Sequence, residues 1–302
     1  MVPATDTAMD AALSAAISIA FHGVAYGMVL YLISVGLSVT MGLMGFVNLA
    51  HGVFAMAGGY AAVTLMARAG LPFFPALALS VVIVAALGMM IERTLYRRLY
   101  DAGELDQVLF TIGLVFMAVA AAKFIWGPQP QPAPVPEYLR GQLVMGGRAF
   151  PAYRSFLILS GAVVVAGLWL GLGRTRFGAQ IRATVDNRRM AQSIGINTSL
   201  LFTCSFALGS GLAALGGALG ADILAIDPTY AQEHLVFFLI VVAVGGLGSI
   251  IGPLAAALLL GVTASACSYL APQFGAFFIY AATLAILLWR PHGLFGRKGA
   301  GP

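Results

Sequence analysis

Two polar side chains, Asn48 and His51, stand in a long stretch of sequence that carries no charge. Asp10 and Arg68 bound this stretch, and no Asp, Glu, Lys or Arg lies between them. An Asn side chain offers a donor and an acceptor, and a neutral His ring offers one of each. Because they are three residues apart, the two side chains would share one face of a helix. Such a pair could bind a polar solute in apolar surroundings, or it could join neighbouring helices by hydrogen bonds.

Glycines surround this pair. Gly42, Gly45 and Gly52 would permit a break in a helix or the close approach of a ligand. Discontinuous membrane helices often build the substrate sites of transporters. We therefore take Asn48, His51, Gly45 and Gly52 as candidate substrate-pathway residues. The alternative is that they only hold the helices together.

The most charged segment, residues 173–199, offers a different kind of interaction. Arg182 and Arg188 stand there beside small apolar residues such as Ala183 and Ala191. A basic loop of this kind sets membrane topology. Its length and its helix-forming residues also predict a short helix that could dock on a partner protein.

Residues that would support enzymatic chemistry are missing from the sequence. Its only lysines, Lys123 and Lys298, fit no phosphate-binding loop, and its four histidines lack metal-ligand spacing. No paired carboxylates lie within the apolar stretches, which argues against an intramembrane protease or a proton-coupled carrier. We therefore expect no catalytic residue, no metal site and no enzymatic activity.

Composition defines the solvent that surrounds the chain. Hydrophobic residues make up 60% of the 302 residues and charged residues only 9%, whereas soluble domains average about 25% charged residues. A water-soluble surface cannot be built from so few charged residues. Most of the surface of the protein must therefore face lipid. The net charge of +5 then indicates contact with membrane lipid headgroups rather than with nucleic acid.

Apolar stretches predict an all-α bundle of about eight to nine membrane spans, which forms a single domain over residues 1–302. A spanning helix needs about 20 apolar residues. One or two of the candidates could be half-helices that do not cross. The predicted spans are 13–40, 51–67, 73–91, 107–126, 155–173, 200–221, 235–250, 254–270 and 274–289.

Lysines and arginines in short loops predict the orientation. Eleven of the 16 basic residues lie in the segments 92–106, 174–199 and 290–302. Nine crossings place these three segments together in the cytoplasm and the N-terminus outside. The loop 127–154 opens with GPQPQPAPVP, which no helix can continue through, and we expect an extended outer loop there.

Small residues recur at the spacing that lets membrane helices approach closely. Four Gly-xxx-Gly pairs predict tight helix packing: Gly23/Gly27, Gly167/Gly171, Gly216/Gly220 and Gly248/Gly252.

Four blocks of the sequence resemble the permease subunits of bacterial ABC importers for branched-chain amino acids, of the LivH type. Residues 42–62, GLMGFVNLAHGVFAMAGGYAA, are similar to a G-x-x-N-[FL]-[AG]-H-G run of that family. Residues 175–197 resemble its cytoplasmic loop, and residues 245–261 its late glycine turn. The ending LWRPHGLFGRK, residues 288–298, matches the pattern R-P-x-G-L-F-G. The four blocks occur in order over nearly the whole chain.

The resemblance implies a multi-pass subunit of the bacterial inner membrane that works by alternating access. It implies a second homologous permease, two ABC ATPase subunits and a periplasmic or lipid-anchored solute-binding protein as partners. The partner ATPases would bind ATP and Mg, and this chain would hold no cofactor. In the cytoplasmic loop, about 174–199, the resemblance implies that the ATPase-coupling residues are Gly178, Arg182, Ala183, Asp186, Asn187, Ala191 and Gly195.

One residue leaves the substrate open. Val53 follows His51 and Gly52 directly, whereas many family members with a branched-chain substrate have an acidic residue there. Branched-chain or other hydrophobic amino acids are the expected substrates, and urea, short amides or aromatic acids are the alternatives. A secondary transporter or channel is the alternative from another class.

Overall fold

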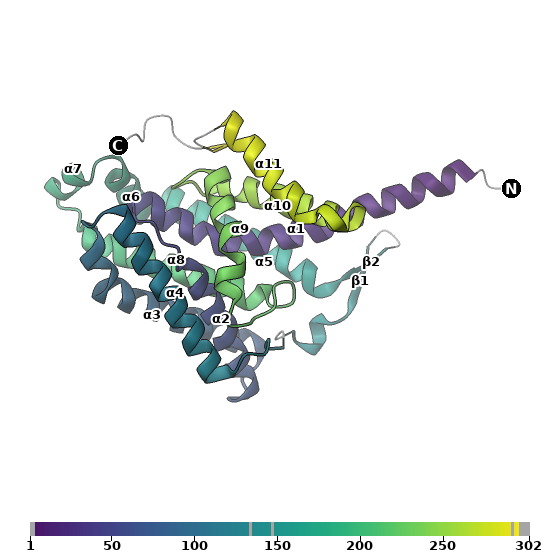
Figure 1. Ribbon diagram of the computed structural model, residues 1–302, viewed down its shortest axis with the longest axis horizontal. Helices are drawn as coiled ribbons and strands as arrows, with labels where there is room; N and C mark the ends of the chain where they lie inside the picture. Colours follow the sequence, from purple (N-terminus) through teal and green to yellow (C-terminus); the bar gives the residue numbers. More distant parts are fainter. Residues whose placement is uncertain (1–3, 133–134, 146–147, 291–292, 296–302) are drawn as a thin grey trace.

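The computed structural model of the protein describes residues 4–132, 135–145, 148–290 and 293–295. These residues form an elongated bundle of helices with one small β-hairpin (Figure 1). The bundle confirms the predicted polytopic, helical architecture.

Nine apolar helices correspond one by one to the predicted spans. Six of them, α1, α3, α4, α5, α8 and α10, are long and apolar enough to cross a membrane, whereas α2, α9 and α11 are shorter. The number of crossings therefore stays a prediction. The nine helices are α1 (Ala4–Met44), α2 (His51–Ala67), α3 (Phe73–Thr94), α4 (Glu104–Trp126), α5 (Ala152–Arg174), α8 (Thr198–Gly220), α9 (Tyr230–Gly245), α10 (Ile251–Leu270) and α11 (Gly275–Trp289).

Helix α1 is longer than the predicted span 13–40. Its 41 residues correspond to about 60 Å at 1.5 Å per residue, twice the thickness of the hydrocarbon core of a bilayer. Its N-terminal part extends beyond the rest of the bundle (Figure 1).

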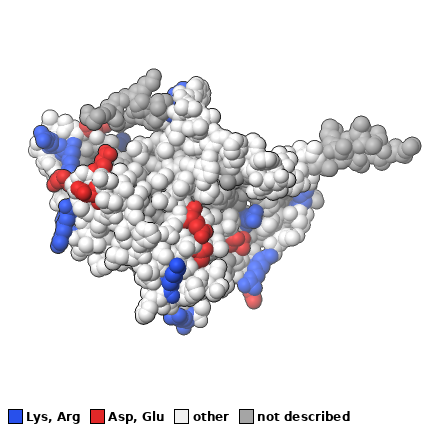
Figure 2. Space-filling view, viewed as in Figure 1, with Lys and Arg blue, Asp and Glu red and all other residues white. Residues whose placement is uncertain are grey.

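The core lies around α1 and α8. These two helices pack against each other. Helix α1 also packs against α10, α5 and α9, and α8 also packs against α2 and α3. Within their most apolar windows, 83% of the α1 residues and 72% of the α8 residues are buried, whereas only 22% are buried in α3, α4 and α5. The latter three helices expose large apolar side chains such as Phe116, Phe124 and Val163. Most of the surface visible in Figure 2 likewise lacks charged residues, as expected for a surface in contact with lipid.

Glycines make the central contacts possible. Cβ atoms added at Gly216 or Gly220 would meet side chains of α1, and Cβ atoms added at Gly23 or Gly27 would meet the backbone of α10. The pair in α5 behaves differently. No heavy atom lies within 4 Å of an added Cβ at either position of this pair, Gly167 and Gly171. For this pair the prediction of tight packing within the chain was wrong, because α5 lies at the edge of the bundle.

The loop 127–154 contains more structure than predicted. Strands β1 (Gln142–Met145) and β2 (Arg148–Pro151) form an antiparallel hairpin in which Gln142 lies opposite Pro151. An isolated bridge joins Gln131 to Ile226. The dipeptide Gly146-Gly147 between the strands is a common hairpin signal, but four-residue strands are too short for a clear alternation of apolar and polar residues.

The basic segments lie at one end of the bundle. The short helices of the charged segment, α6 (Arg176–Asp186) and α7 (Arg188–Ser193), lie beside the first turns of α8. The guanidinium of Arg97, which follows α3 in the 3-10 turn η1 (Tyr96–Leu99), donates to Thr203 on α8 (3.2 Å). Arg297 and Lys298 lie outside the described residues.

Candidate functional site

The helix break predicted near Asn48 is present. Helix α1 ends at Met44 and α2 begins at His51, and Gly45 between them has a φ of 62°. This left-handed conformation suits glycine, and it ends α1. Asn48 therefore lies in the break and not on a helix. The prediction that Asn48 and His51 share a helical face was wrong for this reason.

Asn48 is buried and joins the break to the turn after α3. Its Oδ1 atom accepts hydrogen bonds from the Tyr96 hydroxyl (2.8 Å) and from the backbone N–H of Ala50 (3.1 Å). Its Nδ2 atom has no hydrogen-bond partner in the described part of the chain. A buried donor without a partner costs free energy. In this conformation the Nδ2 atom of Asn48 therefore remains available to donate to a further group.

His51 is also buried and fixes the start of α2 to α1. Its Nε2 atom lies 2.9 Å from the backbone oxygen of Ile33. A carbonyl oxygen can only accept, so Nε2 carries the proton. The neighbouring Gly52 lies against α9, where an added Cβ would approach Ala231 to 3.2 Å. Gly45 is exposed, and no heavy atom lies within 4 Å of an added Cβ.

The charged segment forms two short helices rather than one. Asn187 separates them, and its Oδ1 atom accepts from the backbone N–H of Met190 (2.9 Å), which caps α7. Thr175 caps α6 in the same way through Gly178, and Asn197 caps α8. Thr and Asn are preferred N-cap residues, so the sequence contained the signal for these helix starts.

The candidate coupling residues divide into a buried and an exposed set. Gly178 and Ala191 are buried, and Gly178 lies directly against the backbone of Leu172. The guanidinium of Arg182 donates to the Leu172 carbonyl oxygen, which fixes α6 to the end of α5. Most of the remaining candidates lie at the surface: Asp186, Asn187 and Gly195 are exposed, and Ala183 is half-buried.

A buried carboxylate near this end was missed by the sequence analysis. Glu92, in the last turn of α3, is fully buried and accepts hydrogen bonds from the hydroxyls of Tyr100 (2.5 Å) and Thr203 (2.6 Å). It also forms an ion pair with Arg97 at 3.8 Å. Burial, and then the hydrogen bond to Glu92, raise the pKa of the Tyr100 hydroxyl, so Tyr100 remains a donor. The predicted span 73–91 leaves Glu92 in the loop that follows, because nothing in the local sequence indicates its burial.

A large cavity at the other end was missed as well. Its volume is about 890 Å³, within the usual range of small-molecule sites. Residues of α1, α5, α9, α10 and α11 and of the loop after α8 line it, among them His22, Tyr26 and Arg154. By contrast, no group of three His, Cys, Asp or Glu side chains suited to a metal ion occurs among the described residues.

These features define a multi-pass membrane protein of the transporter type, with a broken helix in its core and an exposed pair of helices at one end. A family model described as "Branched-chain amino acid transport system / permease component" matches residues 19–287. The match covers most of the chain, so the protein belongs to this family.

Several permeases are similar to this chain over nearly their full length. The "High-affinity branched-chain amino acid transport system permease protein BraD" of Pseudomonas aeruginosa is 30% identical over 292 residues, which cover 91% of this chain and 94% of BraD. LivH of Escherichia coli, strain K12, is 26% identical, with 92% and 94% covered. A probable LivH of Methanocaldococcus jannaschii is also 26% identical, with 90% of each chain covered. No solved structure matches the chain.

Proposed function

We propose that this protein is the permease subunit of an ATP-driven importer for branched-chain or other hydrophobic amino acids. The observation that carries this proposal is the family match over residues 19–287. The names of BraD and LivH, which are similar over more than 90% of this chain, support branched-chain amino acids as the substrate over urea, short amides or aromatic acids. In this proposal the chain moves a solute and catalyses no reaction.

The proposed importer contains three further kinds of component. A second homologous permease pairs with this chain, two ATPases bind ATP and Mg, and a periplasmic or lipid-anchored binding protein delivers the amino acid. The chain lies in the bacterial inner membrane with its N-terminus outside and its C-terminus in the cytoplasm. The basic residues gathered near α6 and α7 support this orientation.

Helices α6 and α7 are the proposed docking site for an ATPase. Val185, Met190 and Ile194 expose large apolar side chains there, beside the exposed Arg188 and Arg189. An apolar surface next to charges, at the end of the bundle and outside the spans, suits contact with a protein better than contact with water alone.

A chain of contacts leads from α7 into the bundle. The Arg188 guanidinium lies 4.9 Å from the centre of the Phe202 ring on α8, and this ring is 5.5 Å from that of Tyr100. Tyr100 in turn donates to Glu92 at the end of α3. A movement of α7 would therefore displace the cytoplasmic ends of α3 and α8 together.

The same contacts reach the helix break. The ring centres of Phe46 and Tyr100 are 6.1 Å apart, those of Phe46 and Tyr96 are 4.9 Å apart, and Tyr96 donates to Asn48. We propose that Asn48, His51, Gly45 and Gly52 line the solute path in another transport state. ATP binding would favour that state through its differential affinity for the two conformations.

Crosslinking tests the docking site. In a variant in which serine replaces Cys204 and Cys267, single cysteines are placed along α6 and α7, and control cysteines are placed in the loop 92–106. Crosslinks to the ATPase are expected from α6 and α7. Crosslinks from the control loop alone would contradict the docking site. Uptake of leucine by the complete importer in ATP-loaded proteoliposomes tests the function itself.

A further inference from the structure

The large cavity lies at the end of the bundle opposite α6 and α7. Arg154 stands in the first turn of α5, whereas α6 follows directly after the last turn of this helix. The 23 residues of α5 place these two ends about 35 Å apart. In the proposed orientation the cavity therefore opens toward the outside, where the binding protein would release its solute.

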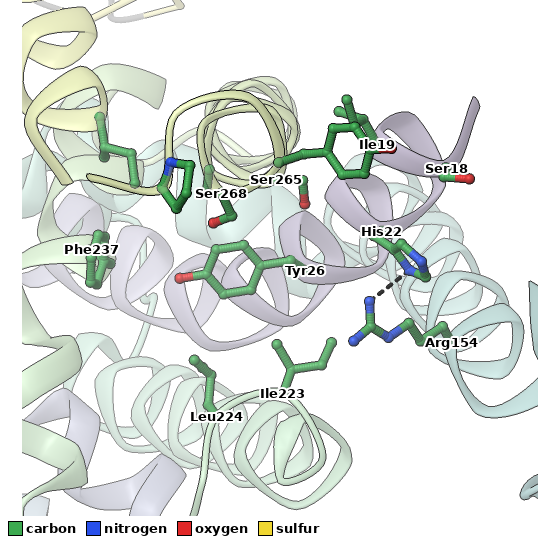
Figure 3. A pocket seen from close by; sticks show the side chains of 14 residues that line it. Ser18, Ile19, His22, Tyr26, Arg154, Ile223, Leu224, Phe237, Ser265 and Ser268 are labelled. Atoms are coloured by element: carbon green, nitrogen blue, oxygen red, sulfur yellow. Dashed lines mark hydrogen bonds between the residues drawn. The ribbon is translucent and has the colours of Figure 1, made fainter. Parts of the chain in front are cut away.

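A cation without a counter-ion stands on one side of the cavity. An Arg154 guanidinium nitrogen lies 2.6 Å from Nδ1 of His22 (Figure 3). A guanidinium can only donate, so Nδ1 accepts and the ring is neutral in this pair. Among the side chains that the structure describes, Arg154 forms no ion pair, and the ion pair found joins Arg97 to Glu92. Arg154 is half-buried and lines the cavity, so its guanidinium is accessible to an anion in that space.

The other walls of the cavity are apolar or carry hydroxyls. Figure 3 shows Phe237 on the side away from Arg154, and Ile223 and Leu224 along one wall. Ser265 and Ser268 of α10 stand across from these two residues. The cavity thus places a guanidinium, several hydroxyls and an apolar wall around one space.

We propose that this cavity binds the amino acid as it enters from the outside, with Arg154 donating to its carboxylate. The solute's apolar side chain lies against the wall formed by Ile223, Leu224 and Phe237, and serine hydroxyls accept hydrogen bonds from its ammonium group. The carboxylate supplies the anion that Arg154 lacks. This inference rests on the proposed function and assigns a site to it.

The complete importer, reconstituted with its binding protein in proteoliposomes, provides the first test. Arg154→Gln removes the charge, Arg154→Lys keeps it, and Arg140→Gln removes an exposed arginine of the outer loop at the same end as a matched control. ATP-driven leucine uptake should fall on the order of 10- to 100-fold in Arg154→Gln, because a hydrogen bond to a charged group is lost. Arg154→Lys should recover part of this loss, and Arg140→Gln should transport like the wild type.

A second test identifies the ligand group without the binding protein. Radiolabelled leucine is bound to the solubilised importer and displaced with 4-methylpentanoate, which keeps the carboxylate, or with leucinamide, which lacks it. Only 4-methylpentanoate should compete, and Arg154→Gln should abolish this difference. Competition by short-chain phosphatidylglycerol alone would instead assign the cavity to a lipid headgroup and overturn the proposal.

The remaining outcomes separate the two proposals. Equal uptake by Arg154→Gln and Arg140→Gln would overturn the site and leave the importer function intact, whereas no leucine uptake by the wild type would overturn the function. If the importer with Arg154→Gln does not assemble, the variant Ser268→Phe tests the site instead. The larger side chain fills the cavity, whereas the Arg154–His22 pair is kept. Strongly reduced uptake by this variant supports the site, and unchanged uptake overturns it.

Discussion

Replacing Gly217 of α8 with alanine should destabilise the protein, whereas the same change at Gly167 of α5 should not. A Cβ added at Gly217 would lie 2.0 Å from the carbonyl oxygen of Ala55 on α2. Carbon atoms in contact normally stay about 3.5–4.0 Å from their neighbours, so α2 and α8 would have to separate. At Gly167 no heavy atom lies within 4 Å of the added Cβ.

Two opposing effects set the magnitude. Alanine is favoured over glycine inside a helix by about 0.5–1 kcal/mol, and both variants gain this amount. Overpacking typically costs about 1–3 kcal/mol, and contact with backbone atoms of Ala55 places Gly217→Ala at the upper end of this range. We therefore expect a net loss of about 2–2.5 kcal/mol for Gly217→Ala, and a small gain for Gly167→Ala.

The measurement is the temperature at which the purified importer in detergent loses its monodisperse size-exclusion peak. A change of 1 kcal/mol shifts the melting temperature of a protein of roughly this size by about 2–4 °C. Gly217→Ala should lower the transition by several degrees, and Gly167→Ala should leave it unchanged or slightly higher. An unchanged transition for Gly217→Ala, or an equal fall for Gly167→Ala, would refute the reasoning from helix spacing.

Three other predictions concern the polar groups and the orientation. Glu92→Gln should cost roughly 1–3 kcal/mol, because the hydroxyls of Tyr100 and Thr203 lose a charged acceptor; the same melting experiment, with the exposed Glu137→Gln as control, checks this. His51→Ala and Asn48→Ala should each reduce leucine uptake with normal assembly if they line the path, or weaken the complex if they only join helices. Unchanged uptake, selectivity and assembly would reject both roles. A reporter fused at residue 10 should be active only outside the cytoplasm, and cytoplasmic activity would reverse the orientation.

Much of the fold was predictable because the bilayer demands long apolar stretches. All nine predicted spans have a corresponding helix. The predicted ends of the spans were less accurate. Helix α1, for example, begins at Ala4, in a segment that is too polar to indicate a span. The hairpin was missed because its register depends on pairing between strands of only four residues.

The candidate site was predictable only where a local signal exists. Gly45 and its neighbours indicated the helix break, because glycine permits the left-handed backbone found there. The partners of Asn48 and Glu92 come from residues 48 and 111 positions away, Tyr96 and Thr203. Contacts over such distances in the sequence follow from the packing of whole helices, which no local pattern records.

The packing of α2 against α8 has a consequence for biosynthesis. Helix α2 has 17 residues, or about 26 Å, which is short for the hydrocarbon core. Its most extensive contacts are with α8, whose first residue, Thr198, is synthesised more than 130 residues after α2 ends. The glycine-lined face of α2 therefore lacks its packing partner until α8 has been synthesised. Insertion of this region cannot be completed helix by helix, and a chain truncated before Thr198 should remain open to quality-control proteases.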